Sequence, residues 1–168
     1  MVISFLGWAA ETVFFWFCYG KVYDRGFMTL PFCTIYGASF LLVYFLAGTL
    51  GEGGVLLRKR GYSLSRTVGC FFLSMVLPTA LELVTGLFFH LFFDVRLWSY
   101  TAYRFHYGGY ICLEYAFLWG VLVPVCMEWV FLPLHRWVFR LDEKWVKTAA
   151  ATVALLAAVD WGVSFSGL

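Results

Sequence analysis

The chain has 168 residues, of which 62% are hydrophobic, 22% are aromatic and only 13% are charged. A soluble domain carries about a quarter charged residues, so this composition excludes an ordinary soluble domain. The net charge of +2 is too small to indicate a nucleic-acid-binding protein.

Five apolar stretches of 18 to 23 residues follow one another along the chain, covering residues 2–19, 32–50, 67–89, 110–132 and 148–165. A bilayer crossing needs about 20 residues. The first stretch contains Glu11 and no basic leader, so we expect it to be a retained helix and not a signal peptide. The connections are too short for a further soluble domain. We therefore expect an all-α fold, in which residues 1–168 form a single integral membrane domain with about five transmembrane helices.

Basic residues are unevenly divided among the four connections. The second and fourth carry eight positive charges and the first and third carry four. The eight are Arg58, Lys59, Arg60, Arg66, Arg136, Arg140, Lys144 and Lys147. Because cytoplasmic loops are enriched in Lys and Arg, we expect a multi-pass cell-membrane protein with a cytoplasmic N-terminus and an external C-terminus.

The two outer connections are rich in glycine and aromatic residues. They read GKVYDRGFMTLPF over residues 20–32 and DVRLWSYTAYRFHYGGY over residues 94–110. This composition favours ordered loops, in part re-entrant. An interfacial aromatic belt is the alternative for Trp98, Tyr100, Tyr103 and Tyr110.

Five acidic residues fall inside the predicted spans, where an unpaired charge is costly. Counted from the predicted outer helix ends, four of them lie about 6 to 12 Å deep, namely Glu11, Glu82, Glu114 and Asp160. The fifth, Glu128, is predicted near the inner surface, where water can solvate it. The four outer acids and the loop residues Arg25, Arg96, Arg104 and His106 are our candidates for an outward-facing polar pathway. In the alternative, purely structural interpretation, arginines pair with the carboxylates and pin the loops to the helices.

The first and third spans share a spacing. Glu11 precedes Arg25 by 14 residues, and Glu82 precedes Arg96 by the same number. Each unit continues into a helix that begins with a cysteine, Cys33 or Cys112. An internal repeat in parallel orientation, as in some transporters, is one interpretation of this similarity, and chance is the other.

The remaining motifs point to no enzyme. The five cysteines form no CxxC pair, and a bridge between Cys33 and Cys112 is left open. The chain has no Walker A sequence, no metal-binding histidine pattern and no nucleophile motif, so we expect no ATPase activity and no cofactor. The GEGG sequence of residues 51–54 lacks the dinucleotide-binding spacing and predicts a loop.

Two segments carry a family resemblance. The first comprises SFLGW at residues 4–8, Glu11, RGF at 25–27, Pro31, Cys33 and IYG at 35–37. The second comprises LELVTG at residues 81–86, Arg96, Trp98, Tyr100, Gly109, ICL at 111–113 and WG at 119–120. Together they resemble the bacterial membrane proteins described as putative type IV ABC-transporter permeases. The pattern departs from the family at Ser99 and Tyr110, where the family carries an acid and an arginine.

The resemblance implies a permease-like subunit of a transport system. Such a small subunit is expected to contact membrane lipid, to form a homo-oligomer or join other membrane chains, and to use a separate ATPase subunit for any ATP-driven step. The alternatives are a non-transporting scaffold or sensor, and a membrane-embedded enzyme acting on a lipid headgroup through Glu82, Arg96 and His106.

Overall fold

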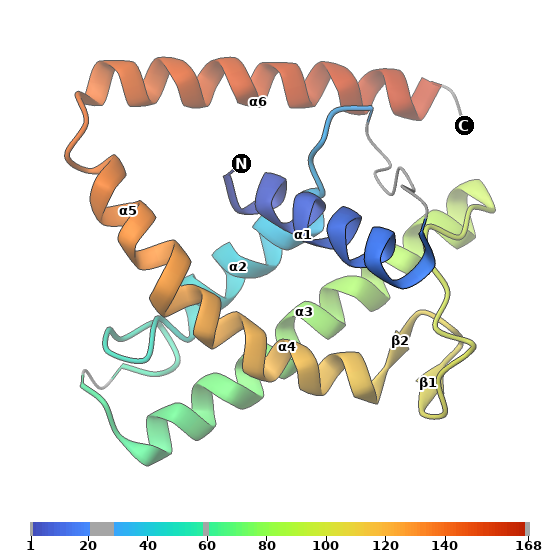
Figure 1. Ribbon diagram of the computed structural model, residues 1–168, viewed down its shortest axis with the longest axis horizontal. Coiled ribbons are helices and arrows are strands. Elements are labelled where there is room, and N and C mark those ends of the chain that lie inside the picture. The colour runs from blue at the N-terminus through green and yellow to red at the C-terminus, as the bar shows by residue number, and fades with distance from the viewer. Residues whose placement is uncertain (1, 21–28, 59–60, 167–168) are drawn as a thin grey trace. The chain divides into compact units, whose positions relative to one another are not determined.

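The computed structural model describes residues 2–20, 29–58 and 61–166. Its elements are α1 (Val2–Tyr19), α2 (Thr34–Leu46), α3 (Leu64–Phe93), β1 (His106–Tyr107), β2 (Ile111–Cys112), α4 (Leu113–Cys126), the π-helix η1 (Met127–Phe131), α5 (Leu132–Val138) and α6 (Glu143–Ser166). The fold is all-α, and the described residues include one two-stranded hairpin, in the loop between α3 and α4 that we call the outer loop after its predicted side (Figure 1).

Three helical segments in the described chain are long and apolar enough to cross a membrane: residues 64–93, 113–138 and 143–166. They overlap the third, fourth and fifth predicted spans, although the fourth was predicted to begin at residue 110 and its helix begins at Leu113, after the hairpin. The shorter apolar helices α1 and α2 occupy the first and second predicted spans. The chain is thus a multi-pass membrane protein.

The second predicted span is too long by two residues at its start and four at its end, because α2 begins at Thr34 and ends at Leu46. Gly48 follows with φ of 78°, a left-handed conformation that terminates helices at little cost for glycine. The chain then turns through residues 47–57, which include the predicted GEGG loop and an isolated bridge between Gly48 and Gly53.

The longest helix, α3, has a defined start and end. The Ser63 side chain accepts a hydrogen bond from the Arg66 backbone N–H, an N-cap that satisfies one of the free donors of the first turn. Asp94 ends the helix in a left-handed conformation with φ of 55°. The helix therefore extends beyond the predicted span at both ends.

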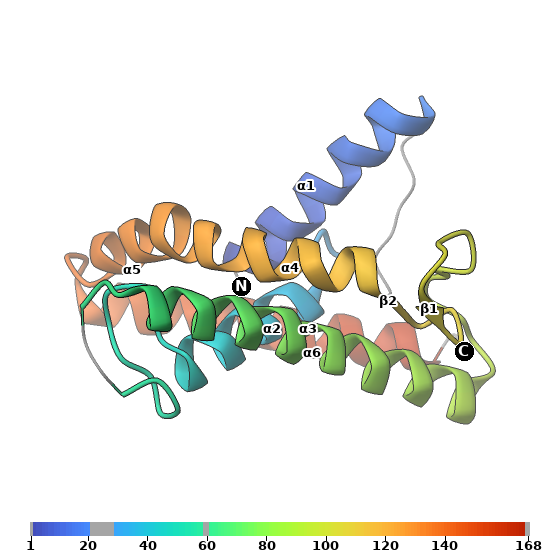
Figure 2. The same cartoon turned by 90° about the horizontal axis from the view of Figure 1, so that it is seen from below.

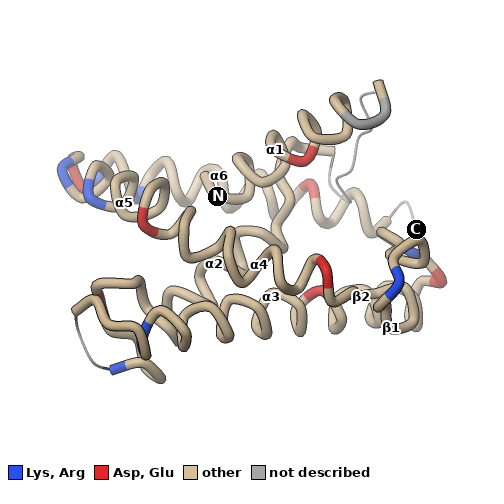
Figure 3. The backbone as a smooth tube through the Cα atoms, turned by 60° about the horizontal axis from the view of Figure 1, so that its bottom comes forward, with Lys and Arg blue, Asp and Glu red and all other residues tan. Residues whose placement is uncertain are grey.

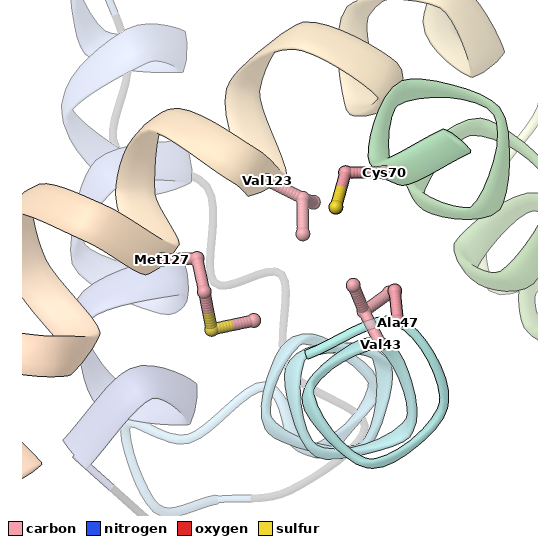
Figure 4. Packing of buried hydrophobic residues seen from close by; sticks show 5 residues of the cluster. All are labelled: Val43, Ala47, Cys70, Val123 and Met127. Carbon is pink, nitrogen blue, oxygen red and sulfur yellow. The ribbon is translucent and has the colours of Figure 1, made fainter. Parts of the chain in front are cut away.

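Contacts divide the chain into two compact units, one of residues 38–133 and one of residues 1–37 and 134–168. In the first unit, α3 packs mainly against α4, and the two helices cross in Figure 1 and lie side by side in Figure 2. The core of this unit lies where α2 and its following loop meet α3, α4 and η1. Its buried side chains point toward one another in Figure 4; they are Val43, Ala47, Cys70, Val123 and Met127.

Candidate functional site

One ridge of α3 is buried along most of the helix, and it is unusually polar for a membrane helix. Apart from Phe89, the buried positions of α3 recur every fourth residue. They are Arg66, Cys70, Ser74, Pro78, Glu82 and Gly86. We call these six residues the α3 stripe. Side chains four apart form a ridge on a helix surface, so the stripe is the ridge that packs into its neighbours.

Small residues of α4 let this helix approach closely. Ala116 and Gly120 are buried on α4. A Cβ atom at Gly120 would lie 2.7 Å from a ring carbon of Phe71 on α3, closer than side chains pack. Such small-residue contacts stabilise helix association in lipid. In Figure 3 most of the two helices is uncharged, with single acidic positions within each.

Glu82 lies in the stripe and is only 9% exposed. Its carboxylate accepts hydrogen bonds from the Trp119 indole N–H at 3.0 Å and from the Tyr100 hydroxyl at 3.5 Å. The acid is therefore held by an aromatic side chain of α4 and one of the outer loop. Because α3 continues to Phe93, Glu82 lies about 16 Å from the helix end, deeper than the predicted span end at Phe89 implied.

Ser74 occupies the middle of the stripe, eight residues from both Arg66 and Glu82. Its side chain is fully buried, and its hydroxyl has no hydrogen-bond partner among the described residues. A buried polar group without a partner is rare in proteins. The position is thus an unsatisfied donor in the interior of this unit.

Arg66, at the other end of the stripe, was predicted to be a cytoplasmic loop charge, and this assignment is wrong. The side chain is 4% exposed and lies in the first turn of α3. Its guanidinium donates to backbone carbonyls of the preceding turn, with Nε 2.9 Å from the oxygens of both Thr49 and Leu50. Further donations reach the carbonyls of Ala47, Glu52 and Leu57. Removing Arg66 from the loop charges leaves seven positive charges against four, which preserves the predicted orientation as an expectation.

Glu128 holds the same turn from η1. Its Oε1 accepts a hydrogen bond from the Leu50 backbone N–H at 2.6 Å, and the residue is half-buried. This acid therefore has a partner within the protein, and its solvation by water at the inner surface stays a prediction. Arg66 and Glu128 together satisfy backbone groups of residues 47–57, which explains how an irregular turn is tolerated beside apolar helices.

The outer loop after α3 is ordered, as predicted, and it closes on Tyr110. The Tyr110 hydroxyl is hydrogen-bonded to His90 Nδ1, and its carbonyl accepts from the Trp98 indole at 2.8 Å. The Arg96 guanidinium lies 5.4 Å from the centre of the Tyr110 ring. Gly108 and Gly109, with φ of 59° and 78°, form the turn between β1 and β2. Trp98 and Tyr110 thus form hydrogen bonds within the protein, which a role in an interfacial aromatic belt does not require.

In the other unit, one of the candidate acids binds the first turn of α2 and another binds the segment before it. Glu11 on α1 accepts a hydrogen bond from the Tyr36 hydroxyl at 3.0 Å. Asp160 on α6 is 7% exposed and accepts from the Thr29 hydroxyl and from the Leu30 N–H at 3.1 Å. Arg25, the pathway candidate 14 residues after Glu11, lies outside the described residues.

The remaining candidates lie at the surface of residues 38–133. Glu114 is exposed in the first turn of α4, and Arg96 and Arg104 are exposed in the outer loop. His106 is in β1, and its Nδ1 accepts from the Gly109 N–H at 3.2 Å. That the four acids share one pathway stays a prediction, because Glu11 and Asp160 belong to one unit and the other two acids to the other.

A cavity of about 600 Å³ lies between α3, the hairpin and α4. Its walls are almost entirely apolar, and His106 is the candidate residue that reaches it. Cys33 and Cys112 are both thiols. The described part of the chain contains no cluster of three His, Cys, Asp or Glu residues that could hold a metal ion.

Sequence reasoning selected Glu82 but missed Arg66 and Ser74. The period of four was the available signal, because arginine, serine and glutamate recur in register along an otherwise apolar stretch.

Comparison with curated proteins and with solved structures found no match to the chain. A family model does match, and it covers residues 1–165. By this match over nearly the whole chain, the protein belongs to the family described as "Putative ABC-transporter type IV".

Proposed function

We propose that the chain is a permease-like subunit of a membrane transport system, and that the α3 stripe is one wall of its pathway. The observation that carries this proposal is Glu82, a carboxylate 9% exposed in a helix long enough to span the membrane. Ionisable residues in such positions are expensive to insert and typically mark substrate or ion paths.

Ser74 supports the same interpretation. An unsatisfied hydroxyl about 12 Å from Glu82 along the helix is a second buried polar position on the same ridge. A water molecule or a passing solute would satisfy it. Ser74 and Glu82 would then provide two successive polar contacts along the pathway.

Access along this wall requires α4 to move, and α4 contains a site for bending. Pro124 interrupts its hydrogen bonding, and the π-helix Met127–Phe131 follows directly. Prolines and π-bulges are the usual causes of helix kinks, and π-bulges are frequent at functional sites. We propose that bending here opens the α3 stripe.

The partners follow from the same proposal. A chain of this size without a Walker A motif would act with further membrane subunits or a second copy, and any ATP-driven step would require a separate ATPase subunit. We propose that this ATPase docks on the second and fourth connections, on the cytoplasmic side. Enzymatic activity is not part of the proposal.

A non-transporting scaffold is the second candidate, and specific contacts favour it. Arg66 and Glu128 bond to the backbone of residues 47–57, and Asp160 bonds to Thr29 and Leu30. These charges act as clamps within the protein. In a scaffold the Glu82 contacts would have the same role.

Measuring metabolite gradients across the membrane distinguishes a transport subunit from a non-transporting scaffold. Cells that lack the chain are complemented with the wild type, Glu82→Gln or Glu143→Gln, and metabolites inside and outside the cells are quantified by mass spectrometry. Glu143 is the control because it is an exposed acid in the first turn of α6, paired with Lys147. We expect one chemical class to lose its gradient in the deletion and in Glu82→Gln, at equal membrane abundance, and to be restored by Glu143→Gln. Gradients that are unaffected by the deletion would refute transport and favour the scaffold.

A further inference from the structure

The apolar cavity of residues 38–133 has the size of a ligand site. Its volume of about 600 Å³ lies within the usual range of roughly 300 to 1,000 Å³ for ligand pockets. It is formed by three elements of one compact unit: α3, the β1–β2 hairpin and α4. The lining side chains of α3 are Met75, Val76, Thr79, Ala80 and Leu83.

The position of the cavity on these helices indicates a hydrocarbon occupant. The lining positions from Met75 to Leu83 extend over about 12 Å of α3, close to the roughly 15 Å depth of one leaflet. Both α3 and the α4–η1–α5 helix are apolar and long enough to span a membrane. A groove along such helices, with walls that offer almost no polar group, suits a lipid chain.

The hairpin end of the groove carries the polar groups. Phe105 and His106 line the cavity. The exposed Arg104 guanidinium lies 5.5 Å from the centre of the Phe105 ring, so a cation stands beside the wall at this end. His106 Nδ1 accepts from the Gly109 N–H, which leaves the imidazole proton on Nε2 as a donor. A guanidinium and an N–H donor are complementary to a phosphate.

We propose that this groove binds one membrane lipid with an anionic phosphate headgroup. The acyl chain lies between α3 and α4, and the phosphate lies at Arg104 and His106. The site is separate from the α3 stripe, and lipid binding there does not require the chain to transport anything.

Lipid selection during purification tests the proposal. The full chain is equilibrated in detergent with equal amounts of phosphatidylglycerol and phosphatidylcholine that carry identical acyl chains, washed in neutral detergent, and the retained lipid is quantified by mass spectrometry. We expect about one phosphatidylglycerol per chain and an enrichment over phosphatidylcholine of about fivefold, as expected for one basic residue near an anionic headgroup.

Two variants remove the two halves of the site. Arg104→Gln should reduce the enrichment to near one, because it removes the cation but leaves the groove. Ala80→Trp should reduce retention of both lipids, because it fills the groove from an exposed position that tolerates the larger side chain. The matched controls are Arg58→Gln, an exposed cation before the opposite end of α3, and Ala151→Trp, at an exposed alanine of α6. Both controls should match the wild type.

Several results would overturn the proposal. They are equal retention of the two lipids by the wild type, loss of enrichment in Arg58→Gln as large as in Arg104→Gln, and unchanged retention in Ala80→Trp. A native mass spectrum in which the wild type is a lipid-free dimer that Ala80→Trp converts to a monomer would instead assign the groove to a second copy of the chain.

Discussion

Replacing Arg66 with methionine should unfold the turn that follows α2. Methionine keeps much of the apolar volume but provides no donor to the carbonyls of residues 47–57. Among these carbonyls, Glu52 and Leu57 also accept from backbone N–H groups, at 3.0 and 3.2 Å. The oxygens of Ala47, Thr49 and Leu50 rely most on the guanidinium.

The expected cost follows from these three acceptors. An unsatisfied buried carbonyl costs about 1 to 3 kcal/mol, and water entry relieves part of the total. We expect Arg66→Met to lower the free energy of unfolding by about 3 to 5 kcal/mol, as is typical when one partner of a buried charged network is removed. For a chain of this size the midpoint of thermal unfolding should then fall by about 6 to 20 °C.

Thermal unfolding in detergent and limited proteolysis measure the effect together. Arg58→Met is the control, because Arg58 is exposed in the same connection and its replacement should change stability by less than about 0.5 kcal/mol. Cleavage of Arg66→Met should increase within residues 47–57. Equal stability of the two variants, with no new cleavage in this turn, would refute the role assigned to Arg66.

Three further predictions follow from the topology and the packing. In a cysteine-free background, single cysteines at Arg60 and Lys144 should be protected from an impermeant thiol reagent in intact cells, and one at Tyr103 should react; labelling at Arg60 would reverse the orientation. A double-mutant cycle of Glu82→Gln and Arg96→Gln should give a coupling energy near zero, because Glu82 accepts from Trp119 and Arg96 lies against Tyr110; strong coupling in thermal unfolding would indicate a clamp between them. Gly120→Ala should lose about 1 to 3 kcal/mol by overpacking against Phe71, whereas Gly162→Ala on α6 has open space around its Cβ position and should be neutral or gain about 0.5 to 1 kcal/mol; equal stability of the two would contradict close packing of α3 on α4.

The helices were largely predictable, because apolar length decides whether a segment can span a membrane. The predicted first span coincides with α1 at both ends, and α6 extends the fifth by a few residues. The end of α2 was not predictable from hydropathy. Residues 47–50 contain no charged residue that would mark the end of a span, and the chain leaves the helix at Gly48, where a guanidinium 16 or more residues later satisfies the carbonyls of Ala47, Thr49 and Leu50.

The acids of the candidate site could be predicted from the sequence, but their hydrogen-bond partners could not. The cost of inserting a charge into the membrane selected Glu82 together with the other four acids inside the predicted spans. The bond of Glu82 to Trp119 joins residues 37 apart, on two helices whose crossing depends on Gly120 and Phe71. No local pattern encodes such a contact. Arg66 was misassigned because a cation before a predicted span normally faces water. Only its position in the series of every fourth residue that includes Ser74 and Glu82 indicates that its side chain is buried.

The central claim is that Glu82 serves a pathway and not only the fold, and the free energy of unfolding of Glu82→Gln tests it most directly. Glutamine retains an oxygen that can accept from the Trp119 indole, so losing the charge should cost only about 1 kcal/mol, the difference between a charged and a neutral hydrogen bond. We predict a stability within about 1 kcal/mol of the wild type, measured in detergent on the same preparations that lose the metabolite gradient in cells. A loss of about 3 to 5 kcal/mol would show that the carboxylate is a buried structural clamp and would contradict the account.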